Sequence, residues 1–168
     1  MRILAEEKKA VLLAGLAQTR AAILAAASVL APAEQDQVFL GDWSVKHLLA
    51  HLTGWDAANL EALQAVRAGR LPAFYAFRGP DWREYNALLV ARCWREDFGE
   101  LAADVRSTHR SLLHLAEEIP PVEFDKDFGV RYRGYKVTIA RLLEAEWKDE
   151  QEHLRQIAAY WSEKLPKA

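Results

Sequence analysis

Apolar and polar residues follow one another along most of the chain with the period of an α-helix. In the second quarter of the chain, for example, Val45, Leu48, Leu52 and Trp55 are three or four residues apart. The strict alternation that is typical of strands is nearly absent. Ala, Leu, Glu, Arg and Gln dominate, and these residues favour helix. We therefore predict an all-α fold, a four-helix bundle in which residues 1–168 form a single domain.

Prolines, glycines and capping residues set the expected helix boundaries. The predicted helices run over about residues 3–29, 44–69, 81–119 and 136–164. Pro32 ends the first helix, Ser44 lies at the start of the second, and Gly99 is a point at which the third can bend. Two long connections, after the second and third helices, carry several aromatic and arginine residues.

Charge and composition exclude several partners. The chain has 22 basic and 24 acidic residues and a formal net charge of −2, which gives no electrostatic case for nucleic acid. Charged residues interrupt the N-terminal segment, and the longest low-charge run, residues 21–33, is too short to span a bilayer. Cys93 is the single cysteine, so no intramolecular disulfide can form. We expect a cytoplasmic protein with no nucleic-acid partner and no membrane contact.

Two histidines and an aspartate flank the apolar faces of the second and last helices. At 100° per residue, the apolar residues of the last helix occupy an arc of about 80°, and His153 lies at its edge with Asp149 one turn earlier. His51 likewise lies at the edge of the apolar face of the second helix. Two imidazoles and a carboxylate suit a divalent ion such as Zn, Ni or Fe. The alternative is that His51 is a core histidine and the others belong to a solvated helix face.

Other polar residues are candidates for supporting roles around this site. Glu150 falls inside the apolar arc, where it can orient His153 as a hydrogen-bond acceptor or accept a proton. The connections supply Tyr75, Arg78, Arg131 and Arg133, and guanidinium groups pair with the carboxylate of a cofactor or substrate. His109 and His114 are five residues apart, so they do not share a helix face and are not expected to form a site.

Two segments resemble motifs of the DinB/YfiT-like superfamily of four-helix-bundle proteins. Residues 43–52 read WSVKHLLAHL, which matches the characteristic start of the second helix in that superfamily. Residues 149–157, DEQEHLRQI, correspond to its last-helix pattern H-E-x-H-H-x-x-Q-[IL]. The resemblance implies a metal triad in which His51 and His153 match family histidines. Asp149 replaces the third histidine, so metal identity and affinity are open.

The resemblance also implies a function. Members include enzymes that use a low-molecular-weight thiol, and self-protection hydrolases of the DfsB type. We expect a divalent-metal-dependent enzyme that acts on a small electrophile by thiol transfer or hydrolysis, with His51, Asp149 and His153 as metal ligands. The expected catalytic residues are Glu150, Tyr75 and Arg133, and the expected cofactor-binding residues are Arg78 and Arg131. The alternatives are a metal-free protein that binds or hydrolyses a small molecule, and a non-catalytic dimeric bundle; a homodimer fits all of these.

Overall fold

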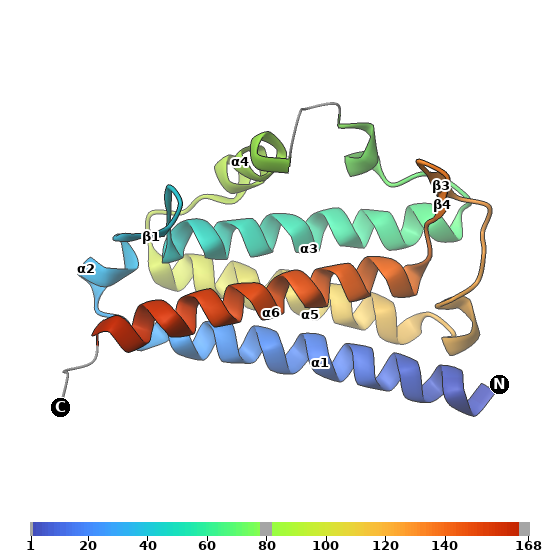
Figure 1. Ribbon diagram of the computed structural model, residues 1–168, viewed down its shortest axis with the longest axis horizontal. Coiled ribbons are helices and arrows are strands. Elements are labelled where there is room, and N and C mark those ends of the chain that lie inside the picture. Colours follow the sequence, from blue (N-terminus) through green and yellow to red (C-terminus); the bar gives the residue numbers. More distant parts are fainter. Residues whose placement is uncertain (1, 78–81, 165–168) are drawn as a thin grey trace.

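Four long helices form a bundle in the computed structural model, which describes residues 2–77 and 82–164 (Figure 1). These helices are α1 (Arg2–Ser28), α3 (Val45–Arg67), α5 (Phe98–Glu118) and α6 (Ile139–Lys164). The shorter helices are α2 (Pro32–Gln35), η1 (Ala73–Ala76), α4 (Trp82–Cys93) and η2 (Pro121–Glu123). Two small antiparallel hairpins complete the fold, β1 (Val38–Leu40) with β2 (Trp43–Ser44) and β3 (Arg131–Tyr132) with β4 (Tyr135–Lys136). The predicted all-α four-helix bundle is confirmed.

The long connection after α3 determines how the helices are arranged. The segment containing η1 and α4 returns the chain to the other end of the bundle, so α3 and α5 run in the same direction (Figure 1). α3 packs mainly against α5 and α4, and α1 packs mainly against α6. The close approach of α1 and α6 requires Gly15, because a Cβ atom there would overlap the indole of Trp147.

The predicted third helix is two helices. The chain leaves helical conformation after Cys93 and begins α5 at Phe98. Asp97 is the N-cap of α5, and its carboxylate accepts a hydrogen bond from the backbone N–H of Glu100 at 2.8 Å. This cap satisfies a donor that a continuous helix would have paired within its own backbone. α4 can therefore turn away from the bundle axis and cover α3.

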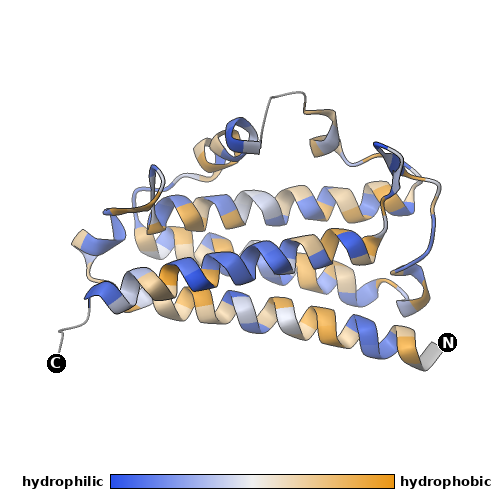
Figure 2. Cartoon of the chain, viewed as in Figure 1, coloured by the Kyte–Doolittle hydropathy of each residue, from blue (hydrophilic) through white to orange (hydrophobic). Residues whose placement is uncertain are grey.

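The core consists of leucine, isoleucine and alanine side chains from all four long helices. Leu16, Leu63, Leu112 and Leu143 are fully buried and belong to the largest hydrophobic cluster. In α6 the pattern differs: a hydrophilic stretch occupies the middle of the helix, with apolar residues on either side (Figure 2). This stretch faces the interior at several positions, and the polar groups described below lie there.

α1 is more apolar than the run of residues 21–33 suggested. Its segment Leu4–Ser28 is long and apolar enough to cross a membrane by length and composition, with a mean hydropathy of 1.6. In the bundle the same helix packs along α6 and carries Arg20, whose side chain is 2% exposed and paired with carboxylates. α1 therefore forms part of the bundle core through one face and presents an apolar surface on the other.

Candidate metal site and adjoining pocket

α3 and α6 bring His51, Asp149 and His153 together. The Nε2 atoms of the two histidines are 3.3 Å apart. Asp149 Oδ2 lies 3.2 Å from His153 Nε2 and 3.6 Å from His51 Nε2. The capping Ser44 starts α3 so that His51 faces α6, and the four-residue spacing of the other two places them on one face of α6.

The three ligand atoms have the spacing of a metal-coordinating set. A tetrahedral zinc ion has bonds of about 2.0–2.1 Å to nitrogen and oxygen, so the edges between its ligand atoms are about 3.3 Å. The separations here, 3.2, 3.3 and 3.6 Å, are close to that value. These residues fit a divalent ion in both chemistry and spacing.

Hydrogen bonds and burial set the state of the two imidazoles. Gln156 Oε1 lies 2.9 Å from His153 Nδ1, so an N–H at Nδ1 leaves Nε2 with a free lone pair. The Nδ1 atom of His51 is buried and has no hydrogen-bond partner. Burial lowers the pKa of His51, which keeps its ring neutral. A neutral imidazole is the form that binds metal.

Asp149 raises the pKa of the neighbouring His51 and His153, against the effect of burial. Burial lowers the pKa of His153, but the hydrogen bond and charge of Asp149 outweigh this effect and raise it. Burial likewise raises the pKa of Asp149, but its bonds to His153 and His51 outweigh this and hold it well below its usual range. The carboxylate is therefore ionised and supplies the negative charge that the family histidine would not.

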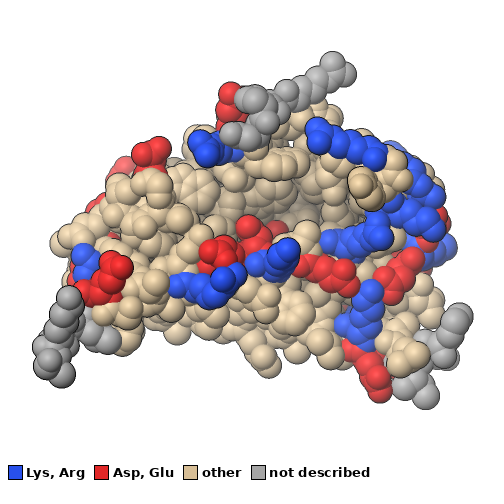
Figure 3. All heavy atoms as spheres, in the orientation of Figure 1, with Lys and Arg blue, Asp and Glu red and all other residues tan. Residues whose placement is uncertain are grey.

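The triad lies at the base of a cavity of about 400 Å³. The surface is hollowed between α4 and α6 in the space-filling view (Figure 3). Five aromatic side chains line the cavity, and the ring centres of Trp43 and His51 are 4.8 Å apart. These aromatic residues are Trp43, Trp55, Phe74, Tyr75 and Trp82. Trp55 donates from Nε1 to Asn86 Oδ1 at 2.9 Å, which fixes its ring in the wall. The cavity is open to solvent, so it can accept a planar apolar group beside the triad.

Of the other predicted site residues, Tyr75 lines this cavity and Glu150 does not. Arg20 binds the carboxylate of Glu150, with Nη2 2.6 Å from Oε1, and Gln156 takes the place beside His153 that was expected for Glu150. Arg131 forms a two-point ion pair with Asp127 at 2.7 Å, so its guanidinium is occupied.

The two remaining predicted arginines are Arg133 and Arg78. Arg133 is exposed at the turn between β3 and β4, and its guanidinium lies 5.2 Å from the ring centre of Tyr132. Arg78 lies outside the described residues.

Glu146 and Asn59 belong to the pocket, and the sequence reasoning missed both. Both side chains are buried, and Asn59 Nδ2 donates to Glu146 Oε2 at 2.9 Å. Burial, and then the charges of Glu150 and Asp56, raise the pKa of Glu146 well above its usual range. Its position three residues before Asp149, on the same face of α6, was the signal available in the sequence.

A second cluster of carboxylates and a histidine lies deeper in the bundle. Asp56, His109 and Glu150 are buried and close enough together to hold an ion. Arg20 occupies that space: it donates to both oxygens of Asp56 at 2.7 and 3.0 Å and to both oxygens of Glu150 at 2.6 and 3.0 Å. Thr108 Oγ1 donates to Asp56 as well, at 2.8 Å. Side chains from all four long helices therefore meet at this point.

Basic side chains gather at the end of the bundle where α3 ends and the β3–β4 hairpin lies (Figure 3). We call this region the basic end, and its exposed residues are Arg67, Arg70, Lys126, Arg131, Arg133 and Lys136. Tyr132 of the hairpin stacks on Tyr75 in the pocket wall, with ring centres 4.2 Å apart and planes 27° apart. The basic end and the pocket therefore share a wall.

Comparison with known proteins decides the family. The model of the DinB superfamily matches residues 15–157 of the chain. The chain belongs to the DinB superfamily. The comparison with curated proteins found no match. A solved structure of the colibactin self-resistance protein ClbS in complex with a dsDNA has the same fold, with a TM-score of 0.65 and 19% identity over 89% of this chain and 94% of the ClbS chain.

This comparison corrects two predictions. The prediction that excluded nucleic acid is wrong, because a DinB-like protein, ClbS, is crystallised with dsDNA. Net charge is a sum over the whole surface, and it does not report a basic region at one end. The predicted function, a metal-dependent enzyme that acts on a small electrophile by thiol transfer or hydrolysis, is also wrong. ClbS is a self-resistance protein in complex with DNA, and the family match carries no specific catalytic function.

Proposed function

We propose that this DinB-superfamily protein binds double-stranded DNA through the basic end. The observation that carries the proposal is the stacking of Tyr132 on Tyr75, because it joins the basic hairpin to the wall of the pocket. A DNA backbone bound at the hairpin would pass the mouth of that pocket. The ClbS complex with dsDNA supports the proposal, since it has the same fold.

The charges at the basic end favour a polyanion. Acids at this end are already paired: Glu123 with Arg67 at 2.9 Å, Asp127 with Arg131 and Lys136 at 2.7 and 3.2 Å, and Asp125 with Lys8 at 2.7 Å. The exposed basic residues that remain are available for phosphate contacts, and they are Arg70, Lys126 and Arg133. Lysine and arginine contacts to phosphate supply most of the affinity of non-specific DNA binding.

The hairpin turn presents its arginine to solvent. Tyr132 pairs with Tyr135, which leaves Arg133 and Gly134 as a two-residue loop. Both have positive φ, 49° and 82°, as a type I′ turn requires. Tyr135 is 73% exposed, so an aromatic face lies beside the arginine. The guanidinium group can contact the sugar–phosphate backbone, and the aromatic ring can stack on bases where the duplex is distorted.

The test is fluorescence anisotropy with a 20-base-pair duplex across a series of KCl concentrations. The variant is the triple change Arg70→Ala, Lys126→Ala and Arg133→Ala, and the matched control is Arg106→Ala, Arg110→Ala and Arg155→Ala, which removes the same charge from α5 and α6. We expect the first triple to weaken binding by about tenfold or more at 50 mM KCl and to lower the salt slope by about 2.7. Equal losses in the two triples, or no binding by the unaltered protein, would refute the proposal.

We also propose that His51, Asp149 and His153 hold a divalent ion, with zinc, nickel or iron as the candidates. The ligand-atom spacing described above favours this second proposal. A bound ion with a free coordination position would supply an attachment point for a water molecule or a phosphate oxygen in the pocket. Tyr75 and the aromatic wall would then limit what can approach that position.

Exchanges at Asp149 test the metal proposal sharply. Asp149→His restores the residue type of the family motif, and Asp149→Ala removes the ligand altogether. After dialysis against zinc, we expect about one equivalent in the unaltered protein and in Asp149→His, and a loss of about 100-fold in affinity in Asp149→Ala. Elemental analysis and competition with a coloured chelator measure both quantities. Metal retained in full by the alanine variant would remove Asp149 from the site.

A further inference from the structure

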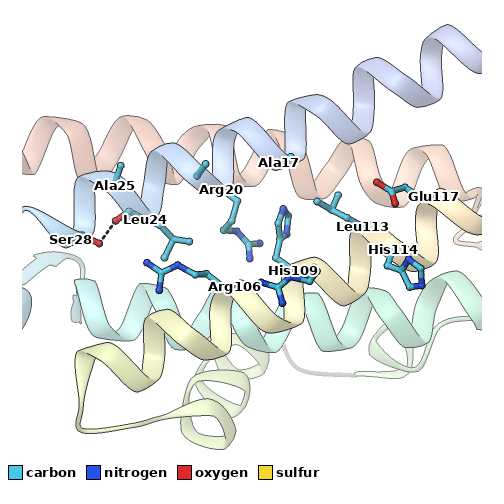
Figure 4. Close-up of a pocket in the computed structure, with 12 residues that line it drawn as sticks. Ala17, Arg20, Leu24, Ala25, Ser28, Arg106, His109, Leu113, His114 and Glu117 are labelled. Atoms are coloured by element: carbon cyan, nitrogen blue, oxygen red, sulfur yellow. Dashed lines mark hydrogen bonds between the residues drawn. The ribbon is translucent and has the colours of Figure 1, made fainter.

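A second cavity lies between α1 and α5, and the proposed DNA and metal functions do not use it (Figure 4). Its volume is about 730 Å³. Arg20 and His109 reach into the space between the two helices, so the buried cluster forms its floor. We propose that this groove binds an organic carboxylate that carries a medium-length hydrocarbon chain.

The α1 side of the groove is an apolar wall. Ala17, Ala21 and Ala25 recur every four residues and lie on one face of α1, and Leu24 lies beside them. Ala21 and Ala25 are exposed. From Ala17 to Ser28 the wall extends over roughly 16 Å, at 1.5 Å per residue. A hydrocarbon chain laid along α1 would remove the part of this surface near Ala17 and Ala21 from water.

The α5 side carries the charge. Arg106 and Arg110 are one turn apart on the same face, both are exposed, and among the described residues no carboxylate forms an ion pair with either. Arg20 differs, since its donors are already taken by Asp56 and Glu150. Two unpaired guanidinium groups beside an apolar wall can hold one carboxylate through several hydrogen bonds.

The ends of the groove give the ligand a direction. Arg106 and Glu117 lie toward opposite ends of the lining in Figure 4. Leu113 lies between them and faces the space next to Ala17. A carboxylate at the arginine end avoids the like charge of Glu117, and its chain can extend over Leu113.

A buried nitrogen provides a second, independent indication of a ligand. His109 is 6% exposed, and its Nδ1 lies 3.5 Å from Asp56 Oδ1. Its Nε2 is buried and has no hydrogen-bond partner. Buried polar atoms are nearly always paired, so this one marks a place where a partner is missing. A carboxyl group that displaces the atoms covering this nitrogen can pair with it, whether the imidazole presents a lone pair or an N–H.

Calorimetric titration with octanoate, octylammonium and acetate tests the proposal. Octanoate has both the chain and the negative charge, octylammonium has the same chain with the opposite charge, and acetate has the charge without the chain. We expect saturable binding of octanoate, with the other two weaker by about tenfold or more, since a charge-assisted pair or an apolar chain each contributes at least that factor.

Two variants locate the site. Arg106→Gln with Arg110→Gln should weaken octanoate binding by about tenfold, and Ala21→Phe should fill the groove and abolish it. Arg92→Gln, an exposed arginine on α4, is the matched control and should bind as the unaltered protein does. Circular dichroism checks that each variant is folded. The proposal is overturned if octanoate does not bind, or if octylammonium binds as tightly as octanoate. It is also overturned if both groove variants bind octanoate as the unaltered protein does.

Discussion

Two clusters in the bundle contain the same residue types in different states. His51, Asp149 and His153 converge without a lysine or arginine bonded to them among the described residues, and Asp56, His109 and Glu150 converge around the guanidinium of Arg20. The first cluster lies beside the aromatic-lined cavity, and the second is buried among the four long helices at the floor of the groove between α1 and α5. Each carboxylate in the second cluster has both oxygens bonded to Arg20, whereas Asp149 in the first is bonded to the two histidines. Each cluster contains one buried ring nitrogen without a partner, Nδ1 of His51 and Nε2 of His109.

The difference separates a cluster that an arginine fills from one that a metal ion can fill. A buried carboxylate requires a positive partner, and a protein can supply one as an arginine or leave the place for a metal ion. Arg20 supplies it in the deeper cluster, so a metal there would have to displace a fully bonded side chain. Composition alone does not separate the two cases, because both clusters consist of histidine and carboxylate.

The largest expected effect is the loss of Arg20. Arg20→Met keeps most of the side-chain volume and leaves Asp56 and Glu150 buried without their partner. We expect the free energy of unfolding to fall by about 3–5 kcal/mol, because an uncompensated buried charge is strongly destabilising. Urea denaturation followed by circular dichroism measures the change. Arg92→Met is the exposed control, and a loss in Arg20→Met no larger than in that control would contradict the structural role.

The next largest expected effect is a loss of zinc affinity, which should differ between the two clusters. His153→Ala removes a proposed ligand from the first cluster, and His109→Ala removes the histidine of the second. We expect zinc affinity to fall by about 100-fold in His153→Ala and to stay unchanged in His109→Ala, since Arg20 already occupies the deeper place. Competition with a coloured chelator gives both affinities. Equal losses in the two variants would mean that the clusters do not differ as proposed.

The helical pattern predicted the bundle but not the division of its third helix. Periodicity reports which face of a helix is buried, and it continues smoothly across residues 94–97. The break depends on the capping hydrogen bond from Glu100 to Asp97 and on the packing of α4 on α3, where Gly54 allows the close approach of Leu89. Those are contacts between particular atoms, and helical periodicity does not include them.

The candidate site was also predicted only in part, because helical spacing does not include contacts between different helices. Helical spacing and the family motif led to His51, Asp149 and His153, which the fold brings together. The same arithmetic put Glu150 on the inner face of α6, and this is where it lies. It did not show that Arg20, 130 positions away in the sequence, would bind that carboxylate. The partner of a buried charge is set by tertiary packing, which one helix does not encode.

A smaller effect is expected from the hydrogen-bond partner of the site. Gln156→Ala removes the acceptor that orients His153, and we expect zinc affinity to fall by about tenfold, as is typical for such outer partners. Gln156→Glu keeps an acceptor and should keep the affinity. Gln151→Ala, an exposed change on the same helix, is the control. An alanine variant that binds zinc as well as the glutamate variant would show that His153 needs no orienting partner.

The smallest effect concerns Glu146, which lies between the two clusters. It is 3.8 Å from Arg20 and lines the pocket with Asp149. Burial and neighbouring carboxylates raise its pKa in the folded state, so the unfolded chain loses this proton at lower pH than the folded protein does. The folded state therefore binds more protons above the ordinary glutamate pKa, and the free energy of unfolding falls as the pH rises through that window.

Glu146→Gln removes this titration and keeps an oxygen that can accept the hydrogen bond from Asn59. We expect the variant to gain about 1 kcal/mol relative to the unaltered protein between pH 5 and pH 8, as urea denaturation at the two values would measure. Glu163→Gln, exposed on α6, should show no such gain. If the difference between Glu146→Gln and the unaltered protein is the same at both pH values, Glu146 titrates like a surface glutamate, and burial between the two clusters does not raise its pKa.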